Sequence, residues 1–134
     1  MDVFSNLPNE LITKIGYKAL RFRNIDLNLD IQNFYQTKEM FLDEYSNIYI
    51  DPNIDLLEFI LGDIFFYLNE NELTCDIFKR HNFFKNATDL NVQNYIYFVF
   101  EEFNTHKRFN IIWGLMTPIE RHNCLEYSLS NFFI

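Results

Sequence analysis

The chain has 134 residues, of which 49% are hydrophobic and 19% aromatic. A chain of this size and composition buries one core and is too apolar to stay disordered, so a single folded unit is expected. Nineteen acidic against eleven basic residues give a formal net charge of −8, which would repel a phosphate backbone. Direct nucleic-acid binding is therefore not expected.

The sequence shows no targeting signal and no membrane span. Residues 1–6 lack the positive start and apolar run of a signal peptide. The longest apolar stretch, 60–68, contains Asp63 and is too short to cross a bilayer. Cys75 and Cys124 lie far apart in apolar surroundings, as is typical of reduced, buried thiols. We expect an intracellular protein, cytoplasmic or nuclear, with no membrane partner.

The first predicted helix begins at Pro8, because proline suits the first turn of a helix. Leu7, Leu11 and Ile15 recur at four-residue intervals and would form one apolar stripe along it. The helix is expected to end near Gly16 or to continue to Leu20. This stripe faces either the chain's own core or a second protein.

Two further helices are predicted before a turn. The first covers residues 27–35, and the second begins at Thr37 and continues to about Ser46. Asp51-Pro52-Asn53 then predicts a turn, because the residue before a proline leaves the helical region and Asp and Asn favour turns.

The second half of the chain predicts a core helix followed by shorter ones. Residues 56–68 are apolar on almost every side, which is typical of a helix in the middle of a bundle. A shorter helix is predicted at 72–79, and Thr88 or Asp89 would cap another. Four apolar residues of that helix follow helical spacing: Val92, Ile96, Val99 and Phe103.

The clearest helix start in the sequence is Thr117-Pro118-Ile119-Glu120, which combines an N-cap Thr, a Pro in the first turn and a Glu three residues after the cap. The predicted helix extends from Pro118 to about Asn131. Its docking face is expected to consist of Ile119, Leu125, Leu129 and Phe132. Together these segments predict an all-α fold, a compact bundle of about six to eight helices.

The sequence offers little that would support catalysis. No nucleotide-binding or hydrolase motif is present, and three glycines leave little for a phosphate-binding loop. His122 and Cys124 form the only tight pair of metal-binding types, and their spacing on a helix does not aim both at one ion. A Cys–His nucleophile would need a contact that sequence alone cannot show. We expect no catalytic residue, no metal and no cofactor, and therefore a protein that is not an enzyme.

Other conspicuous residues have a structural and a functional interpretation. Trp113 is expected in the core, and the adjacent Glu101 and Glu102 on a solvated face. The basic residues either complement helix dipoles or form a local contact for phosphate or an acidic peptide. They fall into two groups: Lys18, Arg21 and Arg23, and then Lys79, Arg80, Lys85, Lys107 and Arg108.

Two motifs stand out in the first third of the chain. The first is Leu7-Pro8-Asn9-Glu10-Leu11-Ile12-x-x-Ile15, and the second, in residues 29–41, is an aliphatic stretch that continues into a basic residue and an aromatic one. In this order they resemble the opening and the second landmark of an F-box. An F-box is a short three-helix module whose Leu-Pro start and aliphatic stripe insert into a Skp-type adaptor of a cullin-based ubiquitin ligase. Short F-box proteins of large DNA viruses have a similar character.

The resemblance implies a non-enzymatic adaptor that links a ubiquitin ligase to a target. Residues 4–46 would be the F-box-like segment, and residues 53–134 would bind the target or complete the core, within two modules or one continuous domain. The predicted partner-binding residues are Leu7, Pro8, Leu11, Ile12 and Ile15. The alternative is an acidic helical bundle that inhibits or sequesters a basic host protein directly, since acidic surfaces attract basic ones.

Overall fold

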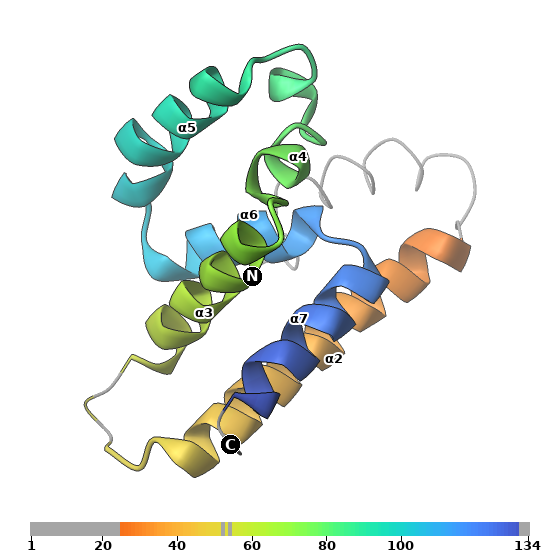
Figure 1. The fold of residues 1–134 in the computed structure, drawn as a ribbon. Helices are drawn as coiled ribbons and strands as arrows, with labels where there is room; N and C mark the ends of the chain where they lie inside the picture. Colours follow the sequence, from red (N-terminus) through yellow and green to blue (C-terminus); the bar gives the residue numbers. More distant parts are fainter. Residues whose placement is uncertain (1–24, 52, 54, 132–134) are drawn as a thin grey trace, which may run out of the picture.

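The computed structural model describes residues 25–51, 53 and 55–131, and this part of the chain is all-α, as predicted (Figure 1). The described residues form six α-helices and two short 3-10 helices, without a strand. Their bounds are α2 (Ile25–Ile48), α3 (Leu56–Glu70), α4 (Thr74–Phe78), η2 (Asn82–Phe84), α5 (Asp89–Phe98), η3 (Phe100–Glu102), α6 (Thr105–Leu115) and α7 (Pro118–Ser130).

Helix α2 is one continuous helix of 24 residues, so the prediction of two segments that meet at residue 36 is wrong. Thr37, read as the start of the second segment, lies inside the helix. Its hydroxyl donates to the carbonyl of Asn33 at 2.7 Å and accepts a hydrogen bond from Trp113 Nε1 at 2.9 Å. Phe34 and Phe41 are fully buried on either side of Thr37, so one apolar stripe crosses the expected break.

Three helices form the body of the molecule. Helices α2 and α7 lie side by side and point in the same direction, while α3 runs the opposite way (Figure 1). Helix α3 contacts α2, α4, α6 and α7, in agreement with the prediction of a helix in the middle of a bundle. Five of its residues are buried: Leu57, Ile60, Leu61, Ile64 and Leu68.

Helix α6 closes the core from another side and is not among the elements predicted above. The Asn104 side chain caps it by accepting a hydrogen bond from the Lys107 amide at 2.8 Å. Trp113 is fully buried, as predicted, with its ring centroid 5.3 Å from that of Phe41 and 5.6 Å from that of Phe109. The contact of Trp113 with Phe41, together with that of Phe109 with Phe34 at 6.2 Å, attaches α6 to α2.

Helix α7 begins as predicted but presents a different face to the core. Thr117 Oγ1 accepts from the Glu120 amide at 3.2 Å, and Glu120 Oε1 accepts from the Thr117 amide at 2.8 Å, which is a complete capping box. Ile119, expected to dock, is 73% exposed. Leu125 is buried and Leu129 half-buried, whereas Phe132 lies outside the described residues.

The buried face of α7 differs from the predicted docking face because a charged residue, Arg121, lies on the side of the helix that faces the core. The buried positions are Arg121, Cys124, Leu125 and Ser128, which follow helical spacing and place Ile119 on the opposite side. The Arg121 guanidinium donates to the carbonyl of Trp113 at 2.8 Å and to the side chains of Asp30 at 2.7 Å and Asn33 at 3.0 Å. A single side chain thus connects α7 with α6 and α2.

Candidate functional site

The residues predicted to bind a Skp-type adaptor lie outside the described residues: Leu7, Pro8, Leu11, Ile12 and Ile15. The part of the F-box-like segment that is described belongs to α2. There, Phe34 and Phe41 are fully buried in the chain's own core, whereas Leu29 and Met40 are exposed. Within the second landmark, only the exposed residues remain available to another protein.

A different set of exposed apolar side chains lies on residues 82–102, the segment formed by η2, α5 and η3, which we call the α5 arm. In Figure 1 it projects at the upper left, above α3. The arm is attached to the body by buried aromatic rings. The ring centroid of Phe78, in α4, is 5.2 Å from that of Phe100, with the rings perpendicular, and 6.4 Å from that of Tyr95.

Local sequence signals explain the shape of the arm. Thr88 caps α5, as predicted, by accepting a hydrogen bond from the Asn91 amide at 3.2 Å. The helix ends at Phe98, about one turn before the spacing through Phe103 suggests, and a 3-10 turn follows. As a result Val99, expected on the inner face, is exposed, and Phe100 enters the core instead.

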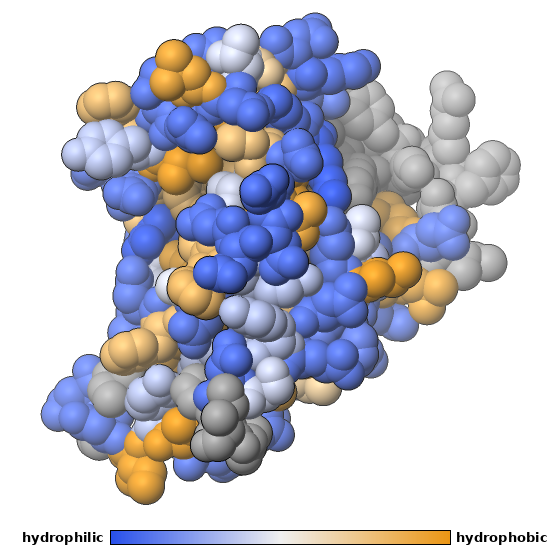
Figure 2. All heavy atoms as spheres, viewed as in Figure 1, coloured by the Kyte–Doolittle hydropathy of each residue, from blue (hydrophilic) through white to orange (hydrophobic). Residues whose placement is uncertain are grey.

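The arm carries large apolar side chains that are exposed to solvent. Phe83 is 79% exposed, Tyr97 66% and Phe98 68%, and Leu90 and Val99 are exposed as well. Figure 2 shows apolar groups over this part of the surface, set among hydrophilic ones. Covering one such side chain contributes about 1.5–3 kcal/mol, so a cluster of them favours association with another molecule.

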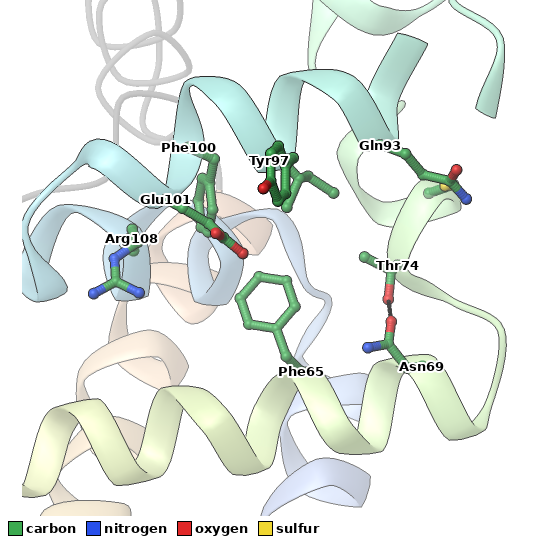
Figure 3. A pocket seen from close by; sticks show the side chains of 10 residues that line it. Phe65, Asn69, Thr74, Gln93, Tyr97, Phe100, Glu101 and Arg108 are labelled. Carbon is green, nitrogen blue, oxygen red and sulfur yellow. Dashed lines mark hydrogen bonds between the residues drawn. The ribbon is translucent and has the colours of Figure 1, made fainter. Parts of the chain in front are cut away.

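Beside this surface, a cleft of about 450 Å³ separates the arm from α3 and α4. Phe65 rises from α3 toward Tyr97 and Phe100, which extend from the arm (Figure 3). Glu101 and Arg108 lie at one end of the cleft, and the opposite end is polar, with Asn69, Thr74 and Gln93. The cleft therefore has aromatic walls and hydrogen-bonding groups at both ends.

The two charged residues that line the cleft, Arg108 and Glu101, differ in whether they have an ion-pair partner among the described residues. Arg108 Nη2 donates to both carboxylate oxygens of Glu58, at 2.8 and 3.2 Å. The Thr105 hydroxyl, and then Arg108, lower the pKa of the Glu58 carboxyl by hydrogen bonding. Glu101 is exposed and forms no ion pair with the described residues. Among the described residues, the charge of Arg108 is thus compensated by an ion pair, and that of Glu101 is not.

A smaller cleft of about 280 Å³ lies on the other side of the arm. Phe83, Phe84 and Tyr95 contribute to it from the arm, and Lys107 from α6. The Lys107 ammonium lies 3.8 Å from the ring centroid of Phe103, which also lines this space. This second cleft is the smaller of the two, and one of its rings already has a cation over it, so the larger cleft is better suited to bind a guest.

Elsewhere, the described arginines are engaged within the fold. Arg80 forms a two-pronged ion pair with Glu120, at 2.5 and 2.8 Å, and donates to the carbonyl of Leu115 at 3.0 Å. This pairing lowers the pKa of the Glu120 carboxyl to about 2. Lys79 pairs with Asp89. For these residues the structure supports internal pairing over an open phosphate site. Lys18, Arg21 and Arg23 lie outside the described residues.

The thiols do not resemble nucleophiles. Cys124 is fully buried, and burial raises the pKa of its thiol to about 12. Burial also raises the pKa of Cys75, which is half-buried at the edge of the larger cleft. A nucleophilic cysteine needs the opposite shift. Among the described residues, no three His, Cys, Asp or Glu side chains gather closely enough to hold a metal ion.

Sequence reasoning did not identify the cleft, although one signal for it was present. Tyr97, Phe98 and Val99 are consecutive apolar residues, and neighbours on a helix point in different directions, so one face cannot bury all of them. Phe65 and Phe100 come from separate elements, and only the fold places their ring centroids 5.6 Å apart.

Within the described part of the chain, no helix combines the length and apolar character needed to span a membrane. No protein-family model, no curated protein and no solved structure matches this sequence.

Proposed function

We propose that this protein is a non-enzymatic protein–protein adaptor. In this proposal the F-box-like N-terminal segment binds a Skp-type adaptor of a ubiquitin ligase, and the α5 arm binds a target. The observation that supports target binding is the group of exposed aromatic and aliphatic side chains on the arm, beside a cleft with aromatic walls. Exposed apolar surface of this kind marks interaction sites in folded proteins.

The arrangement of the helices suits such an adaptor. The N-terminal end of α2, where the F-box-like segment joins the described residues, and the α5 arm lie on different sides of the molecule (Figure 1). Helix α2 packs on α3 and α7, which share one hydrophobic core with α6. Two partners bound at these places would therefore not compete, and the adaptor would act by holding the target close to the ligase.

The ligase-binding half is tested by retention on a purified, immobilised Skp-type adaptor. The full chain should be retained, and Leu11→Asp should abolish retention because a carboxylate interrupts the predicted aliphatic stripe. Ile119→Asp is the matched control, since it places the same charge on an exposed site of α7 and should bind normally. Circular dichroism verifies that both variants are folded, and Leu11→Ala replaces Leu11→Asp if the latter is not. Failure of the unchanged chain to bind would refute the link to a ligase.

A second candidate is an acidic protein that sequesters a basic partner without any ligase. Its support is that Arg80, Arg108 and Arg121 are each paired with a carboxylate inside the fold. Four acidic residues of α2 are meanwhile exposed: Asp26, Glu39, Asp43 and Glu44. This candidate predicts binding to a lysine-rich synthetic peptide that weakens steeply with salt and is insensitive to Leu11→Asp. Binding that ignores salt would contradict it.

A further inference from the structure

We infer that the larger cleft, between the α5 arm and α3, binds a segment of the target protein in which one large apolar side chain lies next to a lysine or arginine. This inference rests on the proposed role in protein binding, because it identifies the chemistry of the target that the arm would recognise. It concerns residues 65–108 and is independent of the segment proposed to bind the ligase.

The walls of the cleft favour an apolar guest, and they are fixed in advance. Phe100 is held by Phe78, at 5.2 Å, and by Phe65, at 5.6 Å between ring centroids, both in edge-to-face geometry. Ile96 is half-buried beside them. Because these rings already pack against one another, a guest side chain would find aromatic faces and edges without first ordering them. A volume of about 450 Å³ is sufficient for a large side chain and part of its backbone.

The charge at the rim favours a cation beside that apolar side chain. The Arg108 guanidinium, the one cationic group among the described residues that line the cleft, already has Glu58 as its partner. Glu101 at the same end has no ion-pair partner among the described residues. A lysine or arginine of the guest would compensate Glu101, whereas an acidic residue would meet an unbalanced negative charge.

The opposite end of the cleft suits a peptide backbone. The Thr74 hydroxyl donates to Asn69 Oδ1 at 2.6 Å, and the Gln93 amide lies near them (Figure 3). Amide groups both donate and accept, so this end could hydrogen bond to the peptide groups that follow the anchoring side chain. Apolar walls with a few polar groups at the ends are usual for recognition sites.

The net charge argues against a second copy of this chain as the guest. With 19 acidic and 11 basic residues, two copies repel each other, and the repulsion is largest at low salt. A basic segment is instead attracted by the same field. Charge therefore favours a foreign, basic segment.

The test uses the full chain and short fluorescein-labelled peptides with a central phenylalanine between two lysines. Control peptides carry alanine in place of phenylalanine, or glutamate in place of both lysines. Fluorescence anisotropy at low salt should show saturable binding of the Lys-Phe-Lys peptide, with each control peptide at least about fivefold weaker. Absence of binding by the Lys-Phe-Lys peptide, or equal binding of the three peptides, would overturn the inference.

Two pairs of neighbouring variants locate the binding site. Tyr97→Ala should weaken binding at least about fivefold, and Phe98→Ala less than about twofold, because both rings are exposed but only Tyr97 lines the cleft. Glu101→Gln should weaken binding about threefold and reduce its salt dependence, whereas Glu102→Gln should change it little. Equal effects within both pairs would place the peptide elsewhere and refute the cleft as its site.

Two further measurements distinguish peptide binding at the cleft from the proposed ligase binding and from self-association. Leu11→Asp should leave peptide affinity unchanged, so a failed ligase test and a failed cleft test are distinguishable. Sedimentation velocity measures the oligomeric state at the same protein concentrations. A dimer that Tyr97→Ala dissociates would mean that a second copy occupies the cleft, and this too would overturn the inference.

Discussion

Arg121 shows how one charged residue determines the packing of a helix. Its guanidinium is fully buried and bonds to Asp30, Asn33 and the carbonyl of Trp113, and it lies 5.6 Å from the ring of Phe34. Desolvation lowers the pKa of Arg121, while Asp30 opposes that shift. The guanidinium remains charged because so strong a base keeps its proton even when buried. Removal of this side chain would take the Arg121 cation away from the partly buried Asp30 carboxylate.

We therefore predict that Arg121→Ala lowers the free energy of unfolding by about 3–5 kcal/mol, the usual consequence of breaking a buried ion pair. Arg80→Ala is the comparison, because the Arg80 side chain is 38% exposed and solvent screens its ion pair, so its loss should cost less than that of Arg121. Urea denaturation followed by circular dichroism measures both. Similar losses for the two variants would show that Arg121 does not hold α7 to α2.

At the scale of elements, α3 carries a residue that weakens it. Gly62 lies in the middle of this helix, and a Cβ added there would meet nothing within 4 Å. Glycine in a helix interior costs free energy because the unfolded chain loses more conformational freedom there than at alanine. The position is exposed, so no packing contact explains its presence.

Gly62→Ala is accordingly predicted to raise the free energy of unfolding by about 0.5–1 kcal/mol. Thermal and urea denaturation should both shift toward higher stability, and peptide binding at the α5 arm should be unchanged. Lower stability in this variant would reveal a contact at Gly62 that the described residues do not provide.

At the scale of the whole molecule, the Arg80–Glu120 pair connects distant parts of the chain. Arg80 follows α4, next to the arm, and Glu120 belongs to the first turn of α7, while Arg80 also reaches the end of α6. The pKa of Glu120 is about 2, below its ordinary 4.5, chiefly because Arg80 donates hydrogen bonds to it. A carboxyl with a lowered pKa stabilises the fold only while it is ionised.

This contribution should be complete above about pH 4.5 and disappear as the pH falls toward 2. Glu120→Gln should therefore be less stable than the unchanged chain at neutral pH. Between pH 4.5 and pH 2, its free energy of unfolding should fall by less than that of the unchanged chain. Arg80→Ala should have the same effect, and the double variant should add little. Urea titrations at a series of pH values measure the slopes, and identical slopes in all variants would contradict the assignment.

The features that sequence predicts well here are local. The capping box at Thr117 and the cap at Thr88 depend on residues within one turn, so they can be predicted without the fold. The buried face of α7 cannot be predicted in this way, because Arg121 is stabilised by Asp30, 91 positions earlier. The position of Thr37 inside α2 is likewise not predictable locally, since its partner Trp113 is 76 positions away. The cleft likewise depends on rings from separate elements, and its Glu101 was predicted only as part of a solvated face.

The single tryptophan provides a built-in reporter for these experiments. Trp113 is fully sealed between α6 and α2, and its indole N–H is bound to Thr37 rather than to water. Its emission should therefore be blue-shifted in the native protein and move to longer wavelength on unfolding. Because the indole does not line the cleft beside α5, a tryptophan-free peptide that binds there should leave this signal nearly unchanged. Unfolding and ligand binding can thus be monitored in one sample through separate optical signals.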